Sequence, residues 1–216
     1  MNREEAGRLL ADELREYEDR NPVVLGIPRG GVIVAGEIAR ILHAELDVVL
    51  SRKLGAPGNP ELAIGAISED GTLFLDEDLR RRLSPHNEFA IYVEDEREKQ
   101  YTMIAESLGR FRSVRPKVPL KGRTVIITDD GIATGSTMQA SIWTVRREVP
   151  EKIIAAVPVG SIEALERTSL EADETVVLKA PPIFYAVGQF YEYFTQTGDE
   201  EVIAALRESA DKAHRP

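Results

Sequence analysis

Two adjacent carboxylates and a small, hydroxyl-rich turn carry the clearest chemistry in this sequence. Asp129 and Asp130 follow directly on the hydrophobic run Val125–Thr128, and the turn Gly135-Ser136-Thr137 comes a few residues later. The β-branched run predicts a buried strand, and the turn can open a helix whose first N–H groups have no partner within the helix. Those N–H groups suit a phosphate, while the two carboxylates can accept hydrogen bonds from a vicinal diol. A sugar phosphate would satisfy both.

A second loop with phosphate-binding character lies earlier in the chain. The apolar run Val23–Ile27 predicts a buried strand, and Pro28-Arg29-Gly30-Gly31 follows it, ahead of a segment with helical spacing. Paired glycines let a backbone approach a ligand closely, and an arginine donates a fork of hydrogen bonds to phosphate oxygens. A tight turn alone would also explain two glycines, so the ligand-binding interpretation depends on the position of this loop ahead of the paired acids.

The segment Val125–Thr137 closely resembles the phosphoribosyl pyrophosphate (PRPP) motif of the type I phosphoribosyltransferases. The resemblance implies that Asp129 and Asp130 hold the ribose 2′- and 3′-hydroxyls. It also implies that the turn wraps the 5′-phosphate with backbone amides and hydroxyls, through Gly131, Ala133, Thr134, Gly135, Ser136 and Thr137. An ordinary helix-capping turn is the alternative explanation, a risk that every motif match carries.

The resemblance extends to two loops that precede the motif. In this family the loop after the first core strand binds pyrophosphate, which gives that role to Arg29, Gly30 and Gly31. Segment 51–60 is rich in glycine and proline and predicts a mobile loop. Its Arg52 and Lys53 resemble residues that reach the pyrophosphate in adenine-type members, where a cation stabilises the charge that grows on the leaving group. A solvated basic turn is the alternative for this pair.

Segment 179–198 is aromatic and irregular, and we expect it to form a small C-terminal cap over the base site. In the 6-oxopurine members a similar stretch closes the base pocket, with an acid that can meet a magnesium ion. Tyr185 and Glu192 match this stretch by position, so the resemblance implies that both bind the acceptor. It also implies that Glu192 is a ligand of Mg²⁺, an ion that PRPP and water mainly hold. Core packing is the alternative for these aromatics. Those enzymes also place an acid where this chain has Ala133, so hypoxanthine and guanine are less favoured and the acceptor stays open.

The composition excludes several classes of protein. The formal net charge of −10 disfavours nucleic-acid binding, because phosphate backbones are held by clustered lysine and arginine. The absence of cysteine excludes thiol catalysis and thiolate metal sites. The first residues are charged and no apolar run approaches the roughly 20 residues of a membrane span. We therefore expect a cytoplasmic protein with no membrane and no nucleic-acid partner.

Strand and helix patterns alternate along the chain, which predicts an α/β fold. The order indicates a Rossmann-like, doubly wound parallel sheet with a type I phosphoribosyltransferase-like core, in a single domain that spans the chain. We expect a flexible hairpin over 61–76 and a helical insertion over 85–117, whose apolar stripe serves internal packing or a homodimer contact. Ligands of such sheets bind beyond the carboxyl ends of the strands, where Arg29, Arg52 and Asp129 all lie.

Together these features favour an enzyme that transfers ribose 5-phosphate from PRPP to a nitrogen acceptor, with release of pyrophosphate. The resemblance implies Mg²⁺ as cofactor, a nucleobase as acceptor and a place in nucleotide salvage. A PRPP-sensing regulatory module without catalysis is the main alternative. Neither a helix-turn-helix unit nor a basic patch is visible, and Arg52 with Lys53 favours an enzyme. An unrelated nucleotide-binding protein is disfavoured, since the P-loop and dinucleotide fingerprints are both absent.

Overall fold

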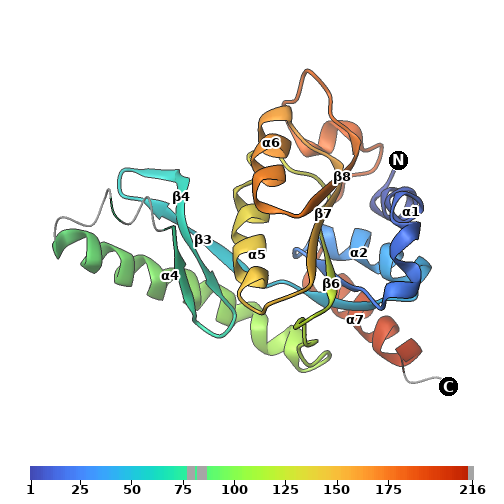
Figure 1. Cartoon of the computed structure of the whole chain (residues 1–216), viewed down its shortest axis with the longest axis horizontal. Helices are drawn as coiled ribbons and strands as arrows, with labels where there is room; N and C mark the ends of the chain where they lie inside the picture. Colours follow the sequence, from blue (N-terminus) through green and yellow to red (C-terminus); the bar gives the residue numbers. More distant parts are fainter. Residues whose placement is uncertain (77–80, 82–86, 214–216) are drawn as a thin grey trace.

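A five-stranded parallel sheet forms the centre of the structure (Figure 1). The computed structural model describes residues 1–76, 81 and 87–213. The strands of the sheet are β1 (Val23–Gly26), β2 (Glu45–Val48), β6 (Thr124–Thr128), β7 (Lys152–Val159) and β8 (Glu174–Lys179). Their order is β2-β1-β6-β7-β8, and every neighbouring pair is parallel. This confirms the predicted α/β sheet, and the winding reverses between β1 and β6, the place where such sheets bind ligands.

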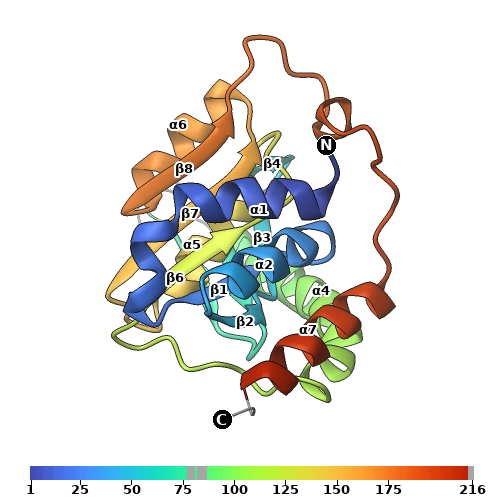
Figure 2. The ribbon, with the colours of Figure 1, turned by 90° about the vertical axis from the view of Figure 1, so that its right-hand side faces the viewer.

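Helices cover both faces of this sheet (Figures 1 and 2). They are α1 (Arg3–Glu13), α2 (Gly30–Ile41) and α7 (Asp199–Ala213) on one face, and α5 (Ser136–Arg146) and α6 (Ile162–Glu171) on the other. A further helix, α4 (Asn87–Arg112), packs against a second, smaller sheet, and short 3₁₀ helices lie at Arg15–Arg20 and Val187–Phe190. Because neighbouring strand residues point to opposite faces, Ile126 packs in the core beneath α1 and α2, whereas Val125 and Ile127 pack beneath α5 and α6. No helix of the described part of the chain is long and apolar enough to cross a membrane.

A smaller antiparallel sheet stands beside the parallel one (Figure 1). Its strands, in spatial order, are β3 (Ser51–Ala56), β4 (Asn59–Ser68) and β5 (Leu73–Leu75). β4 and β5 form the expected hairpin. The prediction of a mobile loop over 51–60 was wrong, because residues 51–56 pair with β4 as a strand. The glycine and proline that suggested a loop are concentrated at the turn between β3 and β4, where Gly58 has a φ of 75°.

The long helix α4 lies within the segment 85–117, of which residues 85 and 86 are outside the described residues. Four of its apolar side chains are buried in the core cluster that it shares with β3 and β4, namely Phe89, Val93, Ile104 and Phe111, whereas Ile91, Tyr101 and Met103 are exposed. Its last residue, Arg112, donates to the buried Asp47 of β2 at 2.7 Å. The apolar stripe of this helix therefore packs within the chain.

Candidate functional site

The paired acids lie at the carboxyl end of β6, in the middle of the sheet. The amide of Asp130 donates to Oδ1 of Asp129 at 2.8 Å. Burial, and then the neighbouring Asp130 carboxylate, raises the pKa of Asp129 well above its ordinary value. The raised pKa disfavours the charged form of Asp129; a carboxyl accepts hydrogen bonds from the hydroxyls of a diol, and donates one when it is protonated.

Gly30 and Gly31 pack directly against these acids. β1 pairs with β6, with Gly26 opposite Thr128, so the two loops that follow these strands meet. A Cβ atom at Gly30 would lie 2.8 Å from Cγ of Asp130, and one at Gly31 would lie 2.7 Å from Cα of Asp129. Only glycine fits at either position. The two predicted phosphate-binding loops therefore form one site, and the first of them contains a cis peptide bond between Pro28 and Arg29, not between Ile27 and Pro28.

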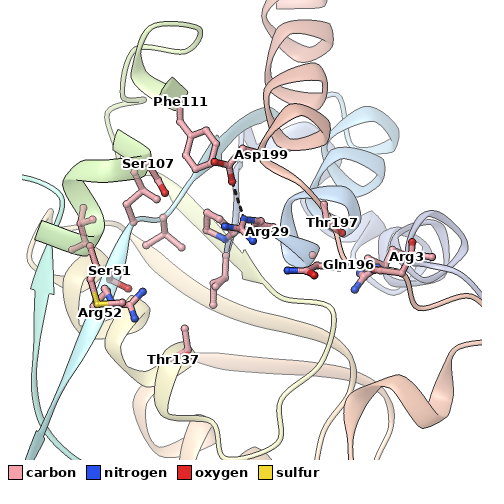
Figure 3. A pocket seen from close by; sticks show the side chains of 18 of the residues that line it. Arg3, Arg29, Ser51, Arg52, Ser107, Phe111, Thr137, Gln196, Thr197 and Asp199 are labelled. Atoms are coloured by element: carbon pink, nitrogen blue, oxygen red, sulfur yellow. Dashed lines mark hydrogen bonds and ion pairs between the residues drawn. The ribbon is translucent and has the colours of Figure 1, made fainter. Parts of the chain in front are cut away.

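A cavity of about 560 Å³ opens beside the paired loops (Figure 3). Strand ends, α4 and the segment that precedes α7 all contribute to its wall. Three arginines line it: Arg3, Arg29 and Arg52. Its volume is within the range of small-molecule sites, and the guanidinium groups of Arg29 and Arg52 give it the positive charge that a pyrophosphate requires, whereas Arg3 donates to Asp130 and Thr195.

Two of the predicted basic residues face this cavity, each with a hydrogen-bond partner. Nε of Arg29 donates to Oδ1 of Asp199 at 2.8 Å, as the dashed line in Figure 3 marks. Nε of Arg52 donates to Oε1 of Gln100 on α4 at 2.7 Å. Lys53 is not among the residues that line the cavity, because successive residues of a strand point to opposite faces. β3 therefore presents one cation of the predicted pair to the site.

The predicted phosphate turn caps α5. Gly135 occupies the N-cap position with a φ of 76°, a conformation that favours glycine. The hydroxyls of Thr134 and Ser136 lie 3.1 Å apart, and Thr137 reaches the cavity wall. Ser161 donates its hydroxyl to the carbonyl of Ala133 at 2.7 Å and so holds the loop from behind. The loop Gly131–Gly135 thus ends at a helix N-terminus, a place that suits an anion, and the first amide of this helix, that of Ser136, donates to Oγ1 of Thr134 at 3.5 Å.

The segment after β8 packs onto the motif through Val187 and Tyr191, and Figure 2 shows its long course to α7. The side chain of Tyr185 is 86% exposed, and Glu192 pairs with the amino group of Met1 at 3.0 Å. Tyr191 instead donates its hydroxyl to the carbonyl of Asp130 at 2.5 Å, and burial raises the pKa of Tyr191. A Cβ at Gly131 would lie 2.6 Å from Cγ1 of Val187. These contacts attach the cap to the acid pair.

Arg3 and Asp199 belong to the site although nothing in their local sequence indicated it. Nε of Arg3 donates to Oδ2 of Asp130 at 2.8 Å, across 127 residues of sequence. Asp199 reaches Arg29 across 170 residues. Each is an ordinary charged residue in the first turn of a helix, so only the packing of α1 and α7 reveals its place.

The sequence matches phosphoribosyl transferases. Residues 2–195 match the family model of the phosphoribosyl transferase domain. Two Mycobacterium tuberculosis proteins, named "Putative phosphoribosyl transferase MT0597" and "Putative phosphoribosyl transferase Rv0571c", are each 46% identical to this chain over 214 residues. The matches cover 99% of this chain and 47% of each relative, so the chain spans about half the length of these curated relatives.

The fold also matches a solved structure over nearly its whole length. The crystal structure of TT1426 from Thermus thermophilus has a TM-score of 0.90 and 47% sequence identity, and the match covers 96% of this chain and 97% of that one. The family model spans both the Gly30-Gly31 loop and the acid pair. With the segment Val125–Thr137 as its PRPP motif, this chain belongs to the phosphoribosyl transferase domain family.

Proposed function

We propose that this protein transfers ribose 5-phosphate from PRPP to a nitrogen of a small acceptor, with a nucleobase as the expected class. The observation that carries the proposal is the contact of the Gly30-Gly31 loop with Asp129 and Asp130, beside a cavity lined by arginines. One end of this arrangement suits a pyrophosphate and the other a ribose 5-phosphate. A cytoplasmic place in nucleotide salvage belongs to the same proposal.

In the proposed reaction the bond between C1′ of the ribose and the pyrophosphate oxygen breaks, and its electron pair leaves with the pyrophosphate. The lone pair of the acceptor nitrogen forms the new bond to C1′, and that nitrogen then loses a proton. Asp129 and Asp130 hold the ribose hydroxyls while C1′ becomes positively charged. Arg29, Arg52 and the amides of the glycine loop receive the charge that develops on the leaving group.

A Mg²⁺ ion held mainly by PRPP and water is the cofactor that belongs to this proposal. Among the residues that the structure describes, no three acidic or histidine side chains lie together as metal ligands. Mg²⁺ commonly keeps several waters and binds substrate phosphates, so PRPP and water would supply most of its ligands while Asp129 and Asp130 hold the ribose hydroxyls. The ion would neutralise the pyrophosphate oxygens.

Calorimetric titration of PRPP with and without Mg²⁺ is the first test. We expect magnesium-dependent binding to the unsubstituted protein and much weaker binding to Asp130→Asn. Asp12→Asn is the matched control, because it removes one carboxylate from the exposed side of α1, where Asp12 pairs with Arg15. Absence of PRPP binding, or an Asp130→Asn variant that binds as the control does, would contradict the proposal.

A pyrophosphate-release assay with a panel of nucleobases then separates the enzyme from a PRPP sensor. An enzyme with one of these acceptors releases pyrophosphate only when that base is present. The sensor hypothesis expects PRPP binding without release for any base. The engagement of Arg29 by Asp199 and of Arg52 by Gln100 is the observation that keeps the sensor as a second candidate.

A further inference from the structure

The side chain of Arg3 contacts separate parts of the site. Its Nε donates to Oδ2 of Asp130 at 2.8 Å, and its Nη1 donates to the carbonyl of Thr195 at 2.8 Å. Its guanidinium carbon lies 4.1 Å from the centre of the Phe194 ring, within the range of a cation–π contact. One side chain of α1 thus links the PRPP motif to the end of the cap.

These contacts leave Arg3 little conformational freedom. Its side chain is 11% exposed and that of Asp130 is 16% exposed, so the pair is largely removed from solvent. A charge-assisted hydrogen bond in such surroundings is stronger and more directional than a surface ion pair. Gly30 also packs closely against the carboxylate of Asp130, because a Cβ added at Gly30 would lie 2.8 Å from Cγ of Asp130.

We propose that Arg3 is a positioning residue for the ribose end of PRPP. The proposal rests on the proposed function, in which Asp130 holds a ribose hydroxyl. Arg3 donates to Oδ2 of Asp130 and leaves Oδ1 to the substrate. Its positive charge compensates the charge of a carboxylate that lies next to Asp129. Because Arg3 also holds Phe194 and Thr195, it ties the end of the cap to the orientation of this carboxylate.

The test compares Arg3→Met with Arg8→Met, titrating both with Mg-PRPP and with magnesium pyrophosphate. Methionine keeps the length and the apolar character of the stem but removes the charge and both donors. Arg8 lies on the same helix, where it forms a 3.6 Å ion pair with Glu37, so it controls for any loss of charge from α1. Thermal unfolding of both variants checks that the fold is retained.

We expect Arg3→Met to weaken Mg-PRPP binding about tenfold or more, the effect of losing a charge-assisted hydrogen bond to a substrate-binding group. Pyrophosphate binding should change by less than about threefold, because pyrophosphate does not use Asp130. Arg3→Lys should recover part of the PRPP affinity, since an ammonium can still pair with Asp130. Arg3→Met should add little to the loss already caused by Asp130→Asn, because the two residues act through one contact.

Three results would overturn this role. The first is an Arg3→Met variant that binds PRPP as tightly as Arg8→Met does. The second is an equal loss of PRPP and pyrophosphate affinity in Arg3→Met, and the third is an effect that adds fully to that of Asp130→Asn. Absence of Mg-PRPP binding to the unsubstituted protein would instead contradict the proposed function itself, and the role of Arg3 with it. The two failures are therefore distinguishable.

Discussion

Asp199 at the start of α7 accepts a hydrogen bond from Arg29 of the glycine loop, at 2.8 Å. Its second carboxylate oxygen accepts from Arg110 of α4, at 3.0 Å. One carboxylate thus lies between two guanidinium groups, and of these Arg29 lines the cavity together with Asp199. A pyrophosphate that binds Arg29 has to compete with it.

Replacing this carboxylate should strengthen anion binding. Asp199→Asn removes the negative charge and leaves Arg29 available, so we expect the affinity for pyrophosphate to rise about threefold to tenfold at low salt, and the gain to shrink as salt is added. Calorimetric titration with pyrophosphate measures it. Asp173→Asn is the control, since Asp173 forms a comparable pair with Arg146 on the surface. Equal or weaker affinity in Asp199→Asn would show that Asp199 supports Arg29 rather than competing for it.

A methyl group at Gly30 should disable the site. Because an added Cβ would lie 2.8 Å from Cγ of Asp130, Gly30→Ala must displace this carboxylate, and we expect Mg-PRPP binding to weaken about tenfold or more. Overpacking of this kind also costs about 1–3 kcal/mol of folding free energy. Gly36→Ala on the same helix is the control, because its nearest neighbours would be 4.0 Å away and alanine is the better helix former. Isothermal titration and urea unfolding of both variants check the difference; equal behaviour would contradict it.

The raised pKa of Asp129 predicts a pH-dependent cost to stability. Below about pH 4 this carboxyl is protonated in both the folded and the unfolded chain, so it contributes no difference. As the pH rises, the unfolded chain ionises first, and the folded state loses relative stability until the pH passes the folded pKa. An asparagine in its place would not ionise, and its side-chain oxygen could still accept from the amide of Asp130. The free energy of unfolding of Asp129→Asn, minus that of the unsubstituted protein, should therefore increase from about pH 4 upward. A difference that stays constant or falls would be inconsistent with a raised pKa.

The ion pair between Arg112 of α4 and the buried Asp47 of β2 should contribute strongly to the free energy of unfolding. Asp47 is 2% exposed, and burial raises its pKa although Arg112 acts in the opposite direction. Arg112→Met leaves this carboxyl buried without its cation, and we expect a loss of about 3–5 kcal/mol in the free energy of unfolding. Combining it with Asp47→Asn should recover part of the loss.

Lys99→Met provides the matched control for this experiment. Lys99 lies on the same helix in an exposed pair with Glu96, so its removal should cost less than about 1 kcal/mol. Urea unfolding of the three variants measures these differences. A loss at Arg112 no greater than that at Lys99 would mean that the buried pair does not hold α4 in place.

The sequence by itself determined the elements of the parallel sheet and the two glycine-containing loops. Runs of buried β-branched residues are a local property, and so is the need for glycine where a chain turns at a strand end. Local patterns failed over 51–60, since one face of β3 is polar and its glycines and prolines cluster at the adjacent turn. That is why Arg52 and Lys53 were placed in a loop, whereas a strand separates them to opposite faces.

The tertiary structure alone decided which charged groups meet around the acids. Arg3 and Asp130 are 127 residues apart, and Arg29 and Asp199 are 170 residues apart. Their contacts depend on the docking of α1 and α7 against the same face of the sheet. The burial of apolar side chains stabilises this docking, and the charged residues do not direct it. The sequence did not show the direction of the side chains in the cap either: Tyr191 contacts the motif, whereas Tyr185, the expected acceptor-binding residue, is exposed. Charged residues at helix starts look alike in sequence, and only packing gives each one its partner.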